Sequence, residues 1–246
     1  MKKETPLVKM EGISKSFGAV RAVHEVELDL FKSEILGLVG DNGSGKTTLM
    51  KVLSGVYQPD DGKIYLDGKE ASFEHRFEAR RMGIEMVFQD LGMCADISIA
   101  ENMFMGRELT REFLGLKLLD KRQMVTESGR SLSDAGVTMP SPKTRVRNLS
   151  GGQQKAIAVM RAVYWNTKIV IMDEPTAALG VKEQHKVLEI MKNLREKNIG
   201  IIFISHNLDE VFSVADRIMV LSRGRKVGDT HKNKVTKDQI VSMLIA

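Results

Sequence analysis

The sequence predicts an α/β fold in which a mainly parallel sheet is covered by helices. Three apolar runs of strand length support this prediction: Ile35–Val39, Lys168–Asp173 and Gly200–Ile204. Continuous apolar runs are typical of strands that are buried on both faces of a sheet. Helical patterns separate these runs along the chain, and strands that alternate with helices favour a doubly wound sheet.

The first part of the chain adds antiparallel strands to this core. Residues Leu7–Phe31 alternate between apolar and polar side chains, a pattern that is typical of strands with one buried face. A glycine-rich turn follows Ile35–Val39, and the pattern of Thr47–Leu53 is helical. Two further short strands are predicted at Gly62–Gly68 and Ile84–Phe88.

A helical subdomain is predicted between about residue 91 and residue 161. The pattern there is mainly helical, with breaks at Gly115, Gly136, Pro140 and Pro142. Because core strands are predicted on both sides of this segment, we expect the subdomain to be inserted into the α/β core.

Beyond the subdomain, helix and strand patterns alternate again. Lys182–Lys197 carries apolar side chains at helical spacing, so an amphipathic helix is expected. Leu208–Val214 is predicted as a shorter helix and Arg217–Leu221 as a strand. No linker, repeat or low-complexity tract divides the sequence, so residues 1–246 are expected to form a single domain.

The composition is that of a soluble globular protein. Hydrophobic residues make up 42% of the 246 residues and charged residues 28%. No apolar run approaches the roughly 20 residues that span a bilayer, and the first residues lack a secretory signal pattern. The single cysteine, Cys94, cannot form a disulfide within the chain, which fits a reducing cytoplasm.

The net charge of +5 is spread over the chain, with acids between the bases. Modest basic clusters lie at Arg80–Arg81, Lys143–Arg147 and Arg223–Lys237. A solvated surface is the simplest interpretation of each cluster, and contact with phosphates or lipid headgroups is the alternative.

A phosphate-binding motif follows the first apolar run. Gly40, Asp41, Asn42, Gly43, Ser44, Gly45, Lys46 and Thr47 match the pattern G-x-x-x-x-G-K-[ST] between a strand and a helix. The glycines let successive backbone N–H groups turn toward a phosphate, and the helix N-terminus adds partial positive charge. Lys46 is expected to bind the β- and γ-phosphates, Thr47 to bind Mg²⁺, and Thr48 to belong to the same nucleotide site.

Four polar residues that follow core strands are candidates for metal and water chemistry. Asp173 ends a strand at the edge where open α/β sheets bind ligands, so we expect it to hold Mg²⁺; a helix cap is the alternative. Glu174 is a candidate for orienting or deprotonating the attacking water, and a surface acid otherwise. Gln89 could reach Mg²⁺ or the water, and His206 the γ-phosphate, although such residues are often only structural.

A second motif stands about a hundred residues after the first. Leu149–Gln153 reads Leu-Ser-Gly-Gly-Gln, which alone could be an ordinary N-capped helix start. With the other motifs in this order, the chain resembles the nucleotide-binding subunit of ABC transporters over nearly its whole length. Leu149–Gln153 resembles the signature motif, Gly40–Thr47 the Walker A loop, and Ile169–Asp173 the Walker B strand with Glu174 as the catalytic glutamate.

The resemblance also implies roles for single residues. Gln89 resembles the Q-loop glutamine and His206 the switch histidine. Phe17 matches the aromatic residue that stacks on adenine; without the resemblance it would be interpreted as a core residue. ATP and Mg²⁺ are the ligands that this resemblance implies.

In this family two nucleotide-binding domains pair head to tail around ATP. The Walker A loop of one domain and the signature motif of the other hold the same nucleotide. The residues expected to meet ATP from the second chain are Ser150, Gly151, Gly152 and Gln153. Since the sequence has one set of motifs, the resemblance implies a homodimer in the ATP-bound state.

The loop after the Walker B strand differs from the common family pattern. Many members have an aspartate at the position of Gly180, and in those members this residue communicates across the dimer. The version Pro175–Gly180 resembles the ATPases of bacterial sugar importers of the ribose, galactose and fructose type. Glu101–Glu108 and Ile204–Leu208 resemble the same subgroup.

The subgroup implies a membrane setting for the chain. The expected partners are integral-membrane permease subunits and a periplasmic or extracellular sugar-binding protein, with no nucleic acid, and the expected location is the cytoplasmic face of the inner membrane. The ATPase of an exporter or of a transporter of another solute is an alternative, and a soluble protein acting on nucleic acid or ribosomes is a weaker one.

Methionines crowd the sequence around Gln89, and methionine is frequent on surfaces that adapt to a partner. A groove for a short permease helix is therefore predicted from these residues, with core packing as the alternative. The set comprises Met82, Met86, Met93, Met103 and Met105, with Phe88, Ile97, Ile99 and Phe104.

Overall fold

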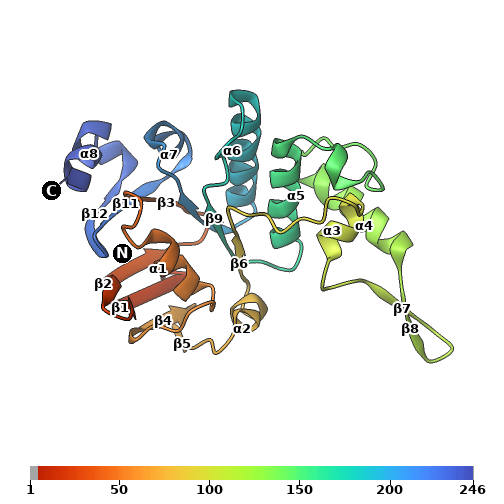
Figure 1. The fold of residues 1–246 in the computed structure, drawn as a ribbon, viewed down its shortest axis with the longest axis horizontal. Coiled ribbons are helices and arrows are strands. Elements are labelled where there is room, and N and C mark those ends of the chain that lie inside the picture. Colours follow the sequence, from red (N-terminus) through yellow and green to blue (C-terminus); the bar gives the residue numbers. More distant parts are fainter. Residues whose placement is uncertain (1–4, 246) are drawn as a thin grey trace.

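The computed structural model describes residues 5–245, and it contains a mainly parallel sheet, an antiparallel sheet and a helical subdomain (Figure 1). The order along the six-stranded central sheet is β12-β11-β3-β10-β9-β6, and all neighbours are parallel except β11 and β12. The predicted α/β fold is therefore confirmed. The strands of this sheet are β3 (Ile35–Val39), β6 (Ile84–Val87), β9 (Ile169–Asp173), β10 (Gly200–Ile204), β11 (Arg217–Ser222) and β12 (Arg225–His231).

The central strands are buried on both faces, as their apolar runs predict. In β9, Ile169 and Ile171 pack into one core cluster, whereas Val170 and Met172 pack into the cluster on the other face. Successive side chains of a strand point to opposite faces, so a strand with helices or a second sheet on each face must be apolar throughout.

An antiparallel sheet covers one of these cores. Its order is β2-β1-β4-β5, with β1 and β2 paired from Val8 and Leu30 at one end to Phe17 and Val20 at the other. The predicted antiparallel strands are therefore present, and β5 is an addition that the sequence did not indicate. The strands are β1 (Val8–Phe17), β2 (Val20–Leu30), β4 (Asp61–Leu66) and β5 (Lys69–Ala71).

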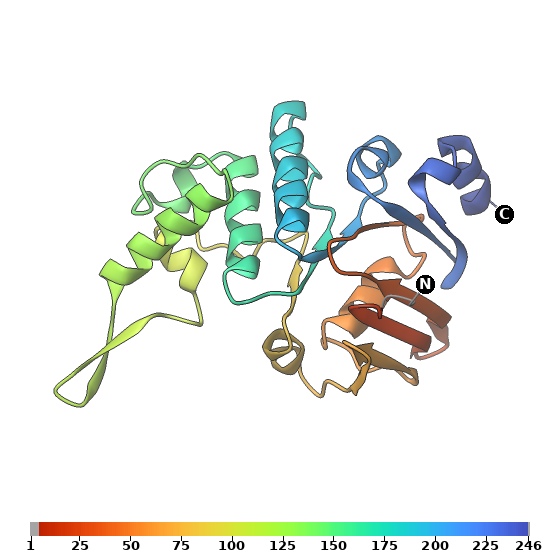
Figure 2. The same cartoon turned by 180° about the vertical axis from the view of Figure 1, so that it is seen from behind.

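Helices occupy both faces of the central sheet (Figures 1 and 2). Leu49, Met50, Val52 and Leu53 of α1 share a core with the antiparallel sheet. On the other face, side chains are buried by α6, α7 and the helix α5 (Gly151–Val163). The helices outside the subdomain are α1 (Lys46–Leu53), α2 (Arg76–Arg81), α6 (Val181–Glu196), α7 (Leu208–Val214) and α8 (Lys237–Ile245), with a 3-10 turn η2 (Lys232–Lys234).

The helical subdomain has its own core, which includes the fully buried Phe104. Its elements are α3 (Ile99–Phe104), the strands β7 (Thr110–Phe113) and β8 (Leu116–Leu119), α4 (Lys121–Asp134), the 3-10 turn η1 (Val146–Asn148) and α5 (Gly151–Val163). The β7–β8 hairpin is a departure from the mainly helical pattern. Leu114 and Gly115 between the strands have φ values of 51° and 76°, which end any helix and reverse the chain.

Part of the predicted methionine groove lies in the core instead. Met86, Met103, Ile99 and Phe104 are buried. Met82 and Met105 are exposed at 47% and 41% of their surface and Met93 is half-buried, so three methionines of the set could meet a partner without rearrangement. Within residues 5–245, no helix has the length and apolar character needed to cross a membrane.

Candidate nucleotide site

The phosphate loop, residues 40–47, joins β3 to α1 at the carboxyl end of the central sheet. A Cβ atom on Gly45 would lie 2.3 Å from the backbone oxygen of Ala22, and Gly45 itself has a φ of 98°. A Cβ atom on Gly40 would lie 2.3 Å from the backbone oxygen of Leu221. Both positions therefore require glycine.

Lys46 folds back over this loop. Its Nζ atom donates to the backbone oxygens of Gly40 at 2.7 Å and Asp41 at 2.8 Å, and the residue is buried. Burial lowers the pKa of Lys46, and the carboxylates of Glu174 and Asp173 oppose this shift. An anion in the loop would give this partly desolvated ammonium group a partner of opposite charge.

Thr47 and Asp173 meet across the site. The Thr47 hydroxyl donates to Oδ2 of Asp173 at 3.0 Å, although 126 residues separate the two in sequence. Asp173 is buried at the end of β9, and this burial raises its pKa against the opposing effect of the Thr47 hydrogen bond. A cation beside the hydroxyl and the carboxylate would offset the cost of burying the charged form.

Glu174 and His206 also form a pair. The Nδ1 atom of His206 lies 2.9 Å from Oε1 of Glu174, and the backbone N–H of His206 donates to the same oxygen at 3.1 Å. Glu174 has a φ of 51°, and its backbone N–H donates to Ile204 O, which ties the end of β9 to the end of β10. The left-handed backbone turns this carboxylate toward the histidine.

Gln89 and Thr48 lie at the same edge of the sheet. The parallel register places Val87 of β6 opposite Met172 of β9, so Gln89, two residues after Val87, emerges beside the end of β9. Gln89 is exposed, and Thr48 is half-buried in the first turn of α1. The fold thus brings the loop, Gln89, Asp173, Glu174 and His206 to one edge.

Phe17 is not a core residue. It is 45% exposed at the end of β1, and its ring contacts Tyr57 edge-to-face with centroids 5.2 Å apart. An exposed aromatic ring held in place by a second ring is suited to stacking on a planar ligand. Tyr57 was missed in the sequence because its partner, Phe17, lies far from it along the chain.

The signature motif caps the helix α5. Ser150 accepts a hydrogen bond from the Gln153 backbone, and Gln153 Oε1 accepts one from the Ser150 backbone, which together form a capping box. Gly151 is exposed, whereas Gly152 is buried against Glu183. In Figures 1 and 2, α5 lies well apart from α1, the helix that follows the phosphate loop.

Gly180 begins α6 beside a carboxylate. A Cβ atom on Gly180 would lie 2.9 Å from Oε2 of Glu183, one turn further along the helix. A carboxylate therefore lies beside position 180, and it belongs to Glu183 in the first turn of α6. Lys155 of α5 donates to the backbone oxygen of Ala177, which connects the signature helix to the same loop.

A buried acid that sequence reasoning missed connects the loops that follow β9 and β10. Glu210 of α7 accepts hydrogen bonds through Oε2 from the hydroxyls of Thr176 and Ser205, the latter at 3.2 Å. Thr176 follows Glu174 and Ser205 precedes His206, so Glu210 holds the two loops to one helix. The one available signal was its position four residues after His206, on the inner side of a short helix.

The donor set fits a nucleotide with Mg²⁺. No group of three or more His, Cys, Asp or Glu side chains within residues 5–245 could enclose a metal. Mg²⁺ commonly takes one or two protein oxygens and completes its shell with phosphates and water. Thr47 and Asp173 are the oxygen donors in place, beside a loop shaped for phosphate.

A strand, a glycine-rich loop and a helix, with an acid at the end of a second strand, define a P-loop nucleotide-binding protein. The family model described as "ABC transporter" matches residues 23–177. The chain therefore belongs to the ABC transporter family, and it has the fold of the family's ATP-binding cassette.

Relatives cover nearly the whole chain. A xylose/arabinose import ATP-binding protein of Sulfolobus acidocaldarius is 41% identical over 97% of this chain and 93% of its own length. A fructose import ATP-binding protein of Rhizobium meliloti is 40% identical over 98% and 94%. Among solved structures, an ABC transporter ATP-binding cassette in its ADP conformation superposes with a TM-score of 0.85 at 25% identity, covering 98% of this chain and 99% of that one.

Proposed function

We propose that this chain is the ATP-hydrolysing subunit of an importer that moves a sugar through a membrane permease. The observation that carries the proposal is the set formed by Thr47, Asp173, Glu174 and His206 around the phosphate loop. The relatives named above, which import pentoses and fructose, favour a sugar as the cargo.

The phosphates of ATP would lie in the loop. On binding, the Lys46 ammonium group would exchange its hydrogen bonds to Gly40 and Asp41 for contacts with the β- and γ-phosphates. Phe17 would stack on adenine. Thr47, Asp173 and Gln89 would hold Mg²⁺, whose charge stabilises the phosphate oxygens.

Hydrolysis would depend on the Glu174–His206 pair. The Glu174 carboxylate is suited to orient the attacking water and accept its proton, as a general base. His206 would hold this carboxylate in place and contact the γ-phosphate, where negative charge accumulates. Positioning and charge stabilisation provide most of the catalysis in phosphoryl transfer.

A second copy of the chain would complete the site. Ser150, Gly151, Gly152 and Gln153 of one copy would approach the γ-phosphate held by the other, where the N-terminus of α5 adds partial positive charge. ATP would then join two copies head to tail, and hydrolysis would let them separate.

The joining and separation of the two copies would be transmitted to a permease at the cytoplasmic face of the membrane. Exposed Met82 and Met105 lie on either side of Gln89 in sequence and are candidates for the permease contact. Because Gln89 would touch the bound nucleotide, the nucleotide and the permease would bias each other's state, as linkage requires.

The test is ATP-dependent uptake in proteoliposomes that contain this chain and the permease with which it co-purifies. Labelled xylose, arabinose, fructose and ribose are supplied outside with the binding protein, and ATP inside. We expect accumulation of at least one sugar with the native chain and none with Glu174→Gln, which should still bind ATP. Hydrolysis without uptake of any sugar, or extrusion of substrate, would contradict the import proposal.

A further inference from the structure

The β7–β8 hairpin projects from the helical subdomain, away from the rest of the molecule (Figures 1 and 2). Every residue of its two strands is exposed, although Phe113 and three leucines belong to them. The exposed fractions are 58% for Phe113, 64% for Leu116 and 40% for Leu118. None of these side chains contributes to the subdomain core.

The register of the hairpin separates two faces. Phe113 pairs with Leu116, and Arg111 pairs with Leu118, so these four side chains share one face. Glu112 pairs with Lys117 on the opposite face. The hairpin therefore presents an apolar face that ends in an arginine toward the base.

The turn at the tip of the hairpin contains a residue that is unfavourable for folding. Leu114 has a φ of 51° and is 87% exposed, next to Gly115 with a φ of 76°. Two-residue turns of this kind favour Asn, Asp or Gly at the first position, because a bulky side chain is strained there. The leucine gains no burial within the chain, so a contact outside the chain is the simplest reason for it.

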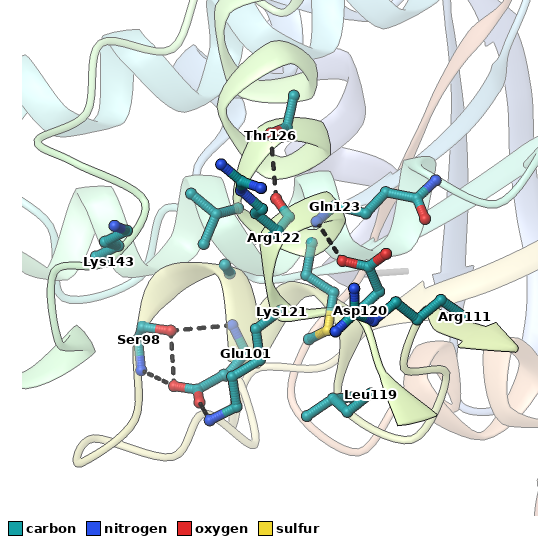
Figure 3. Close-up of a pocket in the computed structure, with 13 residues that line it drawn as sticks. Ser98, Glu101, Arg111, Leu119, Asp120, Lys121, Arg122, Gln123, Thr126 and Lys143 are labelled. Carbon is teal, nitrogen blue, oxygen red and sulfur yellow. Dashed lines mark hydrogen bonds and ion pairs between the residues drawn. The ribbon is translucent and has the colours of Figure 1, made fainter. Parts of the chain in front are cut away.

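Cationic side chains gather behind this apolar tip. Arg111, Lys121, Arg122 and Lys143 line a hollow of about 1200 Å³ at the base of the hairpin (Figure 3). Of these, Lys121 pairs with Glu101, and no ion pair within residues 5–245 involves Arg111, Arg122, Lys143 or the neighbouring Lys117.

The acids of the same region have other partners. Glu101 accepts hydrogen bonds from Ser98 and Lys121, and Asp120 accepts one from the Gln123 backbone as the cap of α4 (Figure 3). Glu112 is the remaining acid of the hairpin, on the face away from Phe113. The base of the hairpin therefore presents cations that an anionic partner could neutralise.

We propose that the hairpin inserts its tip into the surface of an anionic phospholipid bilayer. Phe113, Leu114 and Leu116 would enter the boundary between headgroups and acyl chains, and Arg111, Lys117, Arg122 and Lys143 would contact the lipid phosphates. The apolar side chains project beyond the cations. In the same way, the acyl chains of a bilayer lie deeper than its phosphates. An apolar protein groove would match the tip and leave the cations unpaired.

The location of the hairpin agrees with this partner. In both views its tip lies toward the same edge of the molecule as α2. Met82, proposed above for the permease contact, follows α2 directly. The inference rests on the proposed function, because a permease subunit would bring that edge toward the bilayer. One tip with a few cations would bind weakly alone and serve to orient the assembly.

The test is co-sedimentation of the purified full chain with vesicles, at low and at high salt. We expect binding to vesicles of phosphatidylcholine with phosphatidylglycerol that is about tenfold tighter than to phosphatidylcholine alone, and that weakens with salt. Leu114→Asn should reduce this binding at least severalfold with no loss of thermal stability, because asparagine suits the turn. Lys117→Gln combined with Arg122→Gln should remove the preference for anionic lipid.

Ile245→Asn is the matched control, because Ile245 is 76% exposed on α8 at the opposite end of the molecule from the hairpin (Figure 1). It should leave vesicle binding unchanged. Equal binding by the native chain and Leu114→Asn, or no binding by the native chain, would overturn the proposal.

The two proposals can fail separately. If Leu114→Asn weakened assembly with the detergent-solubilised permease and left vesicle binding intact, the hairpin would be a protein contact and the lipid proposal would be overturned. Vesicle binding that depends on Leu114, in a chain that energises no sugar uptake, would contradict the proposed function and support the hairpin contact.

Discussion

The Nδ1 atom of His206 lies 2.9 Å from Oε1 of Glu174, and the His206 backbone N–H donates to the same oxygen. The glutamate side chain is 16% exposed, whereas the histidine side chain is 72% exposed. The imidazole therefore lies on the solvent side of a largely buried carboxylate, where a second copy of the chain or a phosphate could reach it.

Glu174→Gln should abolish most hydrolysis and preserve ATP binding. A glutamine keeps an oxygen to accept from the His206 backbone but cannot take a proton, so turnover should fall by about 10²–10⁴-fold. Steady-state ATPase rates and light scattering with ATP would measure turnover and dimer formation. Native turnover, or a monomer with ATP and permease present, would contradict the proposed role of Glu174.

Two glycines of the phosphate loop should differ in their tolerance of alanine. Gly43 and Gly45 both have positive φ values, of 81° and 98°, which cost an alanine roughly 1–2 kcal/mol. Only at Gly45 would the new methyl group collide with a backbone oxygen, that of Ala22, whereas Gly43 faces open space. Urea unfolding without nucleotide should show Gly45→Ala as clearly the less stable variant; equal losses would mean that the collision is relieved.

Phe17→Ala should weaken ATP binding and leave the fold intact. The ring is 45% exposed, so its removal creates no core cavity, and stacking of a base on an aromatic ring is worth about 1–3 kcal/mol. Calorimetric titration with ATP would measure the loss, and Phe17→Trp should retain affinity. Unchanged affinity in the alanine variant would place adenine elsewhere.

Glu210→Ala should destabilise the chain and slow hydrolysis together. The hydroxyls of Thr176 and Ser205 would lose their buried acceptor, at a cost of about 1–3 kcal/mol for each unsatisfied group. Glu210→Gln keeps an acceptor oxygen and is the matched control. If both variants lost stability but neither slowed ATP turnover, Glu210 would support the fold without positioning the catalytic loops.

Glu101 should stabilise the helical subdomain in a pH-dependent way. Hydrogen bonds from the Ser98 backbone, from its hydroxyl and from Lys121 lower the pKa of Glu101 to about 2 from its ordinary 4.5. A lowered folded-state pKa adds stability above pH 4.5, and this stability is lost as the pH falls toward 2. The difference in unfolding free energy between the native chain and Glu101→Gln should be largest at neutral pH and shrink at pH 3.5. A difference that does not vary with pH would contradict the assignment.

The central sheet could be predicted because its strands are buried on both faces. Ile35–Val39 and Gly200–Ile204 are apolar at every position but glycine, and the observed strands have the same bounds. The hairpin could not be predicted in this way, because Leu116–Leu119 is exposed and its alternation is too short to distinguish from a helical pattern. The edge strand β12 and the helix α8 were missed for a related reason, since both are largely exposed.

The candidate site also contains residues that could be predicted from the sequence and residues that could not. The residues that would meet phosphate could be named from sequence. A phosphate loop is formed by eight consecutive residues, and their backbone N–H groups bind the phosphates. The supporting contacts could not be named. Tyr57 and Glu210 have no motif of their own, and they matter only because Phe17, Thr176 and Ser205 lie against them.

The sequence by itself determined the family, the order of the core strands along the chain and the loop that would bind ATP. These properties depend on local patterns of apolar side chains and glycine. Only the tertiary structure decided that Thr47 reaches Asp173, that His206 covers Glu174 and that Leu114 projects into solvent. Contacts between residues far apart in sequence depend on strand register and on burial, and these are set by the packing of the whole chain.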